Sequence, residues 1–205
     1  MTNKLLFFVL LALCFSGCDM LETHPYDVHI TGERELTNKN IQLIENKMQG
    51  KKTIRFAMIS DTQRWYNSTE DVVKALNARG DIDFVIHGGD QSDFGVTKEF
   101  IWMRDIFNKF QMPYVCLLGN HDCLGTGEDA YRAIYGDPNF AFTAGNVRFI
   151  CLNTNAMEYD YSEPVPDFNF IENELNNLSP EIEKTVFAKM NKIENKGLTL
   201  SIFCE

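Results

Sequence analysis

Mostly apolar runs recur along the middle of the chain, and each one ends in a short polar segment. Three of these runs cover residues 54–60, 82–87 and 114–118, and stretches with apolar residues at helical spacing lie between them. Continuous apolar runs of this length, flanked by turn residues, are typical of buried strands in a parallel sheet. The regular alternation of such strands with helices predicts an α/β fold.

Further helices and strands are expected between these runs and on either side of them. Helices are predicted at 38–49, at 68–79 with Ser68 and Asp71 as a capping box, at 128–135 and at 168–178. A further helix is predicted after Thr97, which would cap it, with an apolar stripe of Phe100, Met103, Phe107 and Phe110. Strands are predicted at 147–153 and from 184 to 188, with an edge strand at 26–30. The proline-containing segment 154–167 is expected to form a loop.

The start of the chain has the pattern of an export signal. Lys4 precedes an apolar run of eleven residues, Leu5–Phe15. A helix of that length rises only about 16 Å, too little to cross a hydrocarbon core of about 30 Å. This favours a cleavable signal over a membrane span. The segment 15–18 (Phe-Ser-Gly-Cys) resembles a bacterial lipoprotein signal, which implies lipid attachment at Cys18; an ordinary secretory signal cleaved nearby is the alternative.

These patterns divide the chain into four parts. They are a signal peptide at 1–18, an N-terminal extension at 19–50, the first part of the α/β domain at 51–188 and a divergent tail at 189–205. With 44% hydrophobic and 23% charged residues, the chain has the composition of an ordinary folded domain. Its net charge of −10 argues against a nucleic acid as partner, because binding to phosphate backbones requires a basic face.

The cysteines are interpreted as structural. Cys116 and Cys151 lie inside apolar runs, where a thiol behaves as a small buried hydrophobic group. No Cys-x-x-Cys spacing indicates a zinc site. In an exported protein, disulfides among Cys116, Cys123, Cys151 and Cys204 stay open as alternatives.

The candidate chemistry lies in the polar segments that follow the three runs, which we call cassettes. They are 61–63 (Asp-Thr-Gln), 89–90 (Gly-Asp) and 119–122 (Gly-Asn-His-Asp). Asp90 follows Asp61 by 29 residues, and Asn120 follows Asp90 by 30, about one strand–helix–strand unit each. Because parallel strands end at one edge of a sheet, the cassettes are expected to converge there. Hard oxygens and an imidazole are ligands for a divalent cation.

Neighbouring residues extend this hypothesis. His121 is suited to metal binding or proton donation, and Asp93 is placed to orient its ring. Arg64 is a candidate phosphate contact, with surface packing as the alternative, and Trp65 and Tyr66 are candidate lining residues of a substrate pocket. His87, at the end of the second run, is interpreted as a structural residue.

Together, the cassettes resemble the first three sequence blocks of the calcineurin-like metallophosphoesterases, over residues 54–153. The resemblance implies two packed mixed β-sheets flanked by helices and a site with two divalent metal ions, drawn from Mn, Fe, Zn and Mg. It assigns Asp61 to one metal, Asp90 as the bridge between both and Asn120 to the second metal. His121 would then be the proton donor or phosphate contact, paired with Asp93.

The chain departs from this family pattern at two places. Gln63 stands where the family has a histidine, and its amide oxygen is a weaker ligand for zinc or iron than imidazole. The family also takes three histidines from later blocks, and none follows His121 here. We therefore expect an incomplete C-terminal half, with the reading frame truncated or shifted near Ala188.

The sequence thus predicts a metal-dependent phosphoesterase that hydrolyses a phosphate mono- or diester, with activity impaired or lost because the later histidines are missing. It would be a lipoprotein of the cell envelope, on the periplasmic or cell-surface side, with a phosphate ester and a membrane as partners. The alternative is a non-catalytic exported lipoprotein, a remnant or binding module with a vestigial metal site. Metal identity, substrate and oligomeric state stay open.

Overall fold

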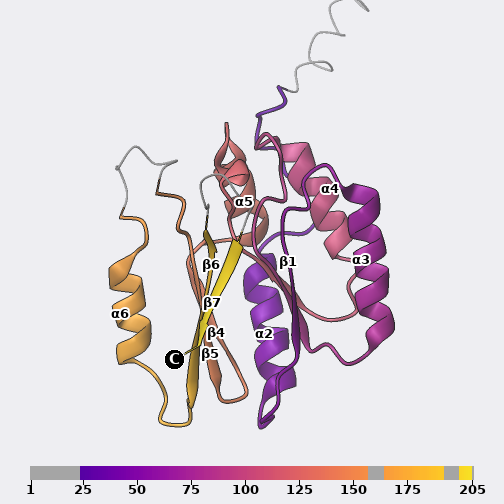
Figure 1. Ribbon diagram of the computed structural model, residues 1–205. Helices are drawn as coiled ribbons and strands as arrows, with labels where there is room; N and C mark the ends of the chain where they lie inside the picture. Colours follow the sequence, from indigo (N-terminus) through magenta and orange to yellow (C-terminus); the bar gives the residue numbers. More distant parts are fainter. Residues whose placement is uncertain (1–23, 157–163, 192–198, 205) are drawn as a thin grey trace, which may run out of the picture.

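The computed structural model describes the backbone of residues 24–156, 164–191 and 199–204, and side chains as far as residue 189 (Figure 1). Helices and strands alternate along most of this range. In chain order they are α2 (Leu36–Met48), β1 (Phe56–Ile59), α3 (Tyr66–Arg79), β2 (Phe84–His87), α4 (Thr97–Phe107), β3 (Tyr114–Cys116), the 3-10 helix η2 (His121–Cys123), α5 (Gly127–Tyr135), β4 (Phe140–Ala144), β5 (Val147–Leu152), α6 (Phe168–Asn176), β6 (Lys184–Asn191) and β7 (Thr199–Cys204).

The first sheet consists of the three strands predicted from the apolar runs. Its order is β1-β2-β3, and both pairs are parallel. All four residues of β2 are buried, as expected for a central strand covered on both faces. In the register, Ile59 pairs with His87, and His87 pairs with Cys116. The three strands therefore end at the same level, and the cassettes that follow them emerge at one edge.

The second sheet has the order β4-β5-β6-β7 and is mixed. β4 and β5 form an antiparallel hairpin, β5 and β6 run parallel, and β6 pairs antiparallel with β7. The sequence patterns indicated β5 and the start of β6 but missed β4, a short strand of five residues. The segment expected to be a divergent tail contributes β7 to this sheet.

An aromatic core joins the two sheets. Phe84 of β2 contacts Phe142 of β4 and Phe149 of β5 edge-on, at ring-centroid distances of 5.6 and 5.4 Å. Phe142 and Phe149 stack on each other at 4.9 Å. Offset stacks and edge contacts of this kind are favourable beyond the apolar area they bury. Ile44 and Met48 of α2 close one side of this core, so that α2 lies against both sheets (Figure 1).

Helices cover the outer faces of both sheets. α3, α4 and α5 pack over the first sheet. The predicted apolar stripe of α4 is confirmed for Phe100, Met103 and Phe107, which are fully buried, whereas Phe110 lies beyond the end of the helix and is partly buried against the same core. α6 lies outside the second sheet, at the left of Figure 1, where Glu174 pairs with Arg148 of β5. The layered arrangement confirms the predicted α/β class, with two sheets flanked by helices.

Three local predictions were wrong. Residues 26–30 form no strand, because their carbonyl groups bond to distant side chains: the hydroxyl of Thr126 donates to the oxygen of Tyr26, and that of Thr97 to Asp27. α3 begins at Tyr66, so Ser68 lies inside the helix rather than at its cap. Thr97 is the first residue of α4, and its N-terminus is held by Glu99 instead.

Among the described residues, no helix has both the length and the apolar character that a membrane crossing requires. Residues 1–23, including the predicted signal peptide and Cys18, lie outside the described part of the chain.

Candidate functional site

The first two cassettes are joined by backbone hydrogen bonds at the ends of β1 and β2. The N–H of Asp61 donates to the carbonyl of Gly89 (3.1 Å), and the N–H of Gln63 donates to the carbonyl of Asp90 (3.1 Å). Both aspartates have a left-handed backbone with φ of 57°. This conformation costs a non-glycine residue on the order of 1–2 kcal/mol, and such strain concentrates at functional sites. The two candidate metal-binding aspartates are therefore held in matching, strained turns.

The third cassette closes against Asp90. The backbone N–H of His121 donates to Asp90 Oδ1 (3.0 Å). Gly119 packs so closely that a Cβ atom there would overlap the backbone nitrogen and Oδ1 of Asp90. A glycine is therefore required for the third cassette to approach the second. The structure thus brings Asp61, Asp90 and His121 to one edge of the sheet, as predicted from the spacing.

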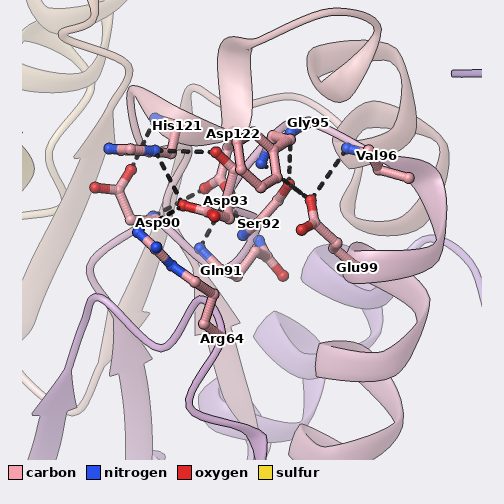
Figure 2. A network of polar contacts seen from close by, with 11 residues as sticks. Arg64, Asp90, Gln91, Ser92, Asp93, Gly95, Val96, Glu99, His121 and Asp122 are labelled. Atoms are coloured by element: carbon pink, nitrogen blue, oxygen red, sulfur yellow. Dashed lines mark hydrogen bonds and ion pairs between the residues drawn. The ribbon is translucent and has the colours of Figure 1, made fainter. Parts of the chain in front are cut away.

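Asp122 is the buried hub of this edge, a role that the sequence analysis missed. Its carboxylate accepts four backbone N–H groups, those of Asp90, Gln91, Ser92 and Gly119, at 2.8–3.0 Å (Figure 2). Burial raises the pKa of Asp122 to about 7, and the nearby charge of Asp90 adds to this, while the N–H donors oppose it. The sequence feature that could have identified Asp122 is its position at the end of the third cassette, directly after His121.

The expected pairing of Asp93 with His121 is made differently. His121 Nδ1 lies 3.0 Å from the backbone carbonyl oxygen of Asp93 and 3.7 Å from its Oδ1. Because a carbonyl only accepts, Nδ1 carries the proton, which leaves Nε2 to accept a proton or bind a metal. The main chain of Asp93, rather than its carboxylate, therefore sets the orientation of the ring.

The carboxylate of Asp93 bonds instead to Arg64. Asp93 Oδ1 lies 3.0 Å from Arg64 Nη2, although Asp93 is almost fully buried and Arg64 largely exposed (Figure 2). Arg64 also has a left-handed backbone, with φ of 67°. Its guanidinium therefore lies directly beside the loop that carries Asp90 and next to His121, which agrees with its predicted place near the site.

The loop after Asp90 is fixed to the start of α4. Glu99 Oε2 accepts from the hydroxyl of Ser92 (2.7 Å) and from the backbone N–H groups of Phe94 (3.1 Å) and Val96 (3.3 Å). Ser92 Oγ in turn accepts from the N–H of Gly95 (2.7 Å), as Figure 2 shows. Residues 90–96 are thus held at both ends, by Asp122 at one and by Glu99 at the other.

The donor chemistry of this edge fits a hard divalent cation. Gln63 Oε1 is buried and has no hydrogen-bond partner within the described part of the chain. Asp61 Oδ2 accepts from the hydroxyl of Ser60 at 2.5 Å. With Asp90 and Asn120, these residues offer carboxylate and amide oxygens, which suit Mg²⁺ or Mn²⁺ better than zinc. Across residues 24–156 and 164–189, no group of three or more His, Cys, Asp or Glu side chains is arranged to hold a metal.

Of the other three histidines, two lie away from this edge and one is buried beneath it. His24 and His29 line a separate cavity beside the start of α4, together with Thr97 and Ile101. His87 is fully buried, and its ring packs on Phe107 at 4.9 Å, which agrees with its interpretation as a structural residue. The described cysteines Cys116, Cys123 and Cys151 form no disulfide.

Comparison with known proteins gives a family and solved structures of similar fold. The family model described as calcineurin-like phosphoesterase matches residues 54–194, more than half of the chain. A solved structure of the purple acid phosphatase PPD1 from yellow lupin (Lupinus luteus) seeds is similar, with a TM-score of 0.51 and 17% identity. The similarity covers 68% of this chain and only 30% of the lupin chain, and at this identity it concerns the fold alone. No curated protein matches. The chain belongs to the calcineurin-like phosphoesterase family.

Proposed function

We propose that this chain is a metal-dependent phosphoesterase that hydrolyses a phosphate mono- or diester at the edge formed by the three cassettes. The observation that carries the proposal is the convergence of Asp61, Asp90 and His121 at the ends of three parallel strands. The family and the fold shared with a phosphatase support it.

Four oxygen donors would hold the metal ions, for which we propose two divalent cations. They are Asp61, Gln63, Asp90 and Asn120, with Asp90 shared between both ions. When bound, such cations polarise the phosphate and lower the pKa of a coordinated water. The buried, unpartnered oxygen of Gln63 supports this assignment, since leaving it without a partner in the folded chain costs free energy.

The protein's own groups would supply the rest of the chemistry. The carbonyl of Asp93 holds the proton of His121 Nδ1, so Nε2 would first take up a proton from solvent and then give it to the leaving oxygen. Arg64 binds the phosphate with its exposed guanidinium, and the buried carboxylate of Asp93 holds that guanidinium in place. Asp93 therefore acts as a positioning residue for both side chains.

Replacing Asp90 tests this proposal most directly. With p-nitrophenyl phosphate and added Mn²⁺, we expect the full chain to release nitrophenol, and Asp90→Asn to lower kcat/KM by at least about 100-fold because the metal ions lose a shared charged ligand. Asp71→Asn, a matched change at an exposed residue on α3, should leave the rate unchanged. Equal activity of the two variants would refute the assignment.

A second candidate function is a non-catalytic module that binds metal or phosphate. It is favoured because, among the described residues, no three His, Cys, Asp or Glu side chains are grouped to hold a metal, so the ligands of a complete two-metal catalytic centre are not assembled there. Calorimetry separates the two functions. Uptake of Mn²⁺ that Asp90→Asn abolishes, without hydrolysis by the unaltered chain, would support this candidate over the phosphoesterase.

We also propose that the protein is exported and anchored to a membrane of the cell envelope through a lipid on Cys18. The apolar run Leu5–Phe15 and the following Ser-Gly-Cys support this proposal. In cells fed radiolabelled palmitate, the chain should incorporate label and sediment with membranes. Cys18→Ser should abolish both effects; label retained by this variant would contradict the assignment.

A further inference from the structure

An exposed tryptophan follows directly after the proposed phosphate contact. Trp65 is 65% exposed and lies between Arg64 and the first residue of α3. A large aromatic side chain left mostly in water forgoes the stabilisation that its burial would bring. Across the described residues, Trp65 makes no ring contact, whereas Trp102, the other tryptophan, packs edge-on against Tyr66 at 5.7 Å.

The main chain of Trp65 is nevertheless firmly held. Its N–H donates to the carbonyl of Thr62 (3.0 Å), and its own carbonyl accepts from the N–H and the hydroxyl of Thr69, both at 2.8 Å. The indole therefore projects from a fixed point of the backbone. A surface that binds a flat ligand needs such a fixed support, because less entropy is then lost on binding.

Two cavities share Trp65 as a lining residue. One, of about 430 Å³, is lined by Gln63, Arg64 and Trp65. The other, of about 300 Å³, lies on the side of Asp61 and is also lined by Trp65. These volumes lie in the range of small-molecule sites. Each cavity is thus lined by Trp65 and by a residue proposed to bind metal.

The charge beside the indole indicates the kind of ligand. Arg64 presents a largely exposed guanidinium in a chain whose net charge is −10. A guanidinium recognises phosphate oxygens, while an indole face stacks on a flat ring. A ligand that satisfies both carries a phosphate and a planar ring within reach of each other.

We infer that the substrates are phosphate esters that carry a planar aromatic ring, with the ring stacked on Trp65 and the phosphate beside Arg64. This inference rests on the proposed phosphoesterase function and specifies its substrate class. Stacking of a base on an aromatic side chain is sufficient to strengthen binding by about tenfold or more.

Tryptophan fluorescence tests the inference without relying on catalysis. In the full chain carrying Trp102→Phe, Trp65 is the single tryptophan. We expect adenosine 5′-monophosphate to quench its fluorescence saturably and to bind about tenfold more tightly than ribose 5-phosphate, which lacks the ring. Phenyl phosphate distinguishes the source of the ring: affinity equal to that of the nucleotide supports a general aryl subsite, and weaker affinity supports a nucleobase subsite.

Matched variants complete the experiment, with affinities measured by calorimetry. Trp65→Ala should abolish the preference for the nucleotide, Trp65→Phe should retain most of it, and Trp102→Ala should leave it unchanged. A preference that survives in Trp65→Ala, or equal affinity of the unaltered chain for both ligands, would overturn the inference. If neither the unaltered chain nor any variant hydrolyses the nucleotide, while the unaltered chain still prefers the nucleotide to ribose 5-phosphate, the phosphoesterase proposal is refuted instead.

Discussion

Asp122 shows how a single buried carboxylate organises the site. It accepts four backbone N–H groups, from Gly119, Asp90 and the two residues after Asp90, and it is fully buried. Without it, these donors would be buried and unpartnered, at about 1–3 kcal/mol each. Asp122 therefore supports the strained turn at Asp90, which would otherwise be free to relax.

Replacing Asp122 by asparagine should destabilise the fold markedly. The amide group has one acceptor oxygen, and its NH₂ would face backbone donors, so we expect Asp122→Asn to lower the free energy of unfolding by about 2–3 kcal/mol. Urea unfolding followed by circular dichroism measures this loss. The control Asp71→Asn, at an exposed position, should shift it by less than about 0.5 kcal/mol. Similar small shifts for both variants would contradict the role of Asp122.

At the level of elements, the site depends on how loops join strands to helices. The loop after β2 is held by Glu99 of α4 and by Asp122 of η2, while Tyr135 of α5 donates from its hydroxyl to Gln91 Oε1 at 2.7 Å. Three elements far apart in sequence thus fix one loop. This explains why Asp93 can hold both Arg64, which follows the first cassette, and His121, which lies in the third.

The end of β2 also predicts a pH dependence. Burial lowers the pKa of His87 to about 3, against an ordinary value of 6.5. Gly89 N–H donates to its Nδ1, so Nε2 carries the proton and donates to Thr62 Oγ1. As the pH falls below about 6.5, the unfolded chain takes up a proton at this residue and the folded chain does not, so the contribution of His87 to stability falls. Between pH 7 and 5 this contribution should fall by about 2 kcal/mol.

The variant His87→Asn isolates this effect, since its amide oxygen still accepts from Gly89. In urea unfolding at pH 7, 6 and 5, the free energy of unfolding of this variant should rise relative to that of the unaltered chain as the pH falls. His29→Asn, at an exposed histidine, should keep the original slope. The raised pKa of Asp122 favours the folded state on acidification, and it is common to all three proteins. Parallel curves for His87→Asn and the unaltered chain would exclude His87 as the cause.

Across the whole molecule, the sequence patterns predicted the helices and strands better than the contacts between them. The central strands and the apolar stripe of α4 were predicted because buried residues of a strand or helix recur in the sequence in a pattern typical of that element. β4 was missed because five residues carry too little of that pattern. The segment 26–30 alternates like a strand, but its carbonyls bond to Thr97 and Thr126. Such contacts over 70 and 100 residues leave no local signal.

The sequence by itself determined the α/β class and the set of polar residues that the strands deliver to one edge, because strand periodicity and strand ends are local properties of the chain. The tertiary structure alone decided how those residues are used. In the folded chain, the Asp122 carboxylate accepts from four backbone N–H groups. The Asp93 carboxylate bonds to Arg64, whereas its backbone carbonyl bonds to His121, and the Trp65 side chain is exposed next to Arg64. These outcomes depend on distances between separate elements, and packing sets those distances.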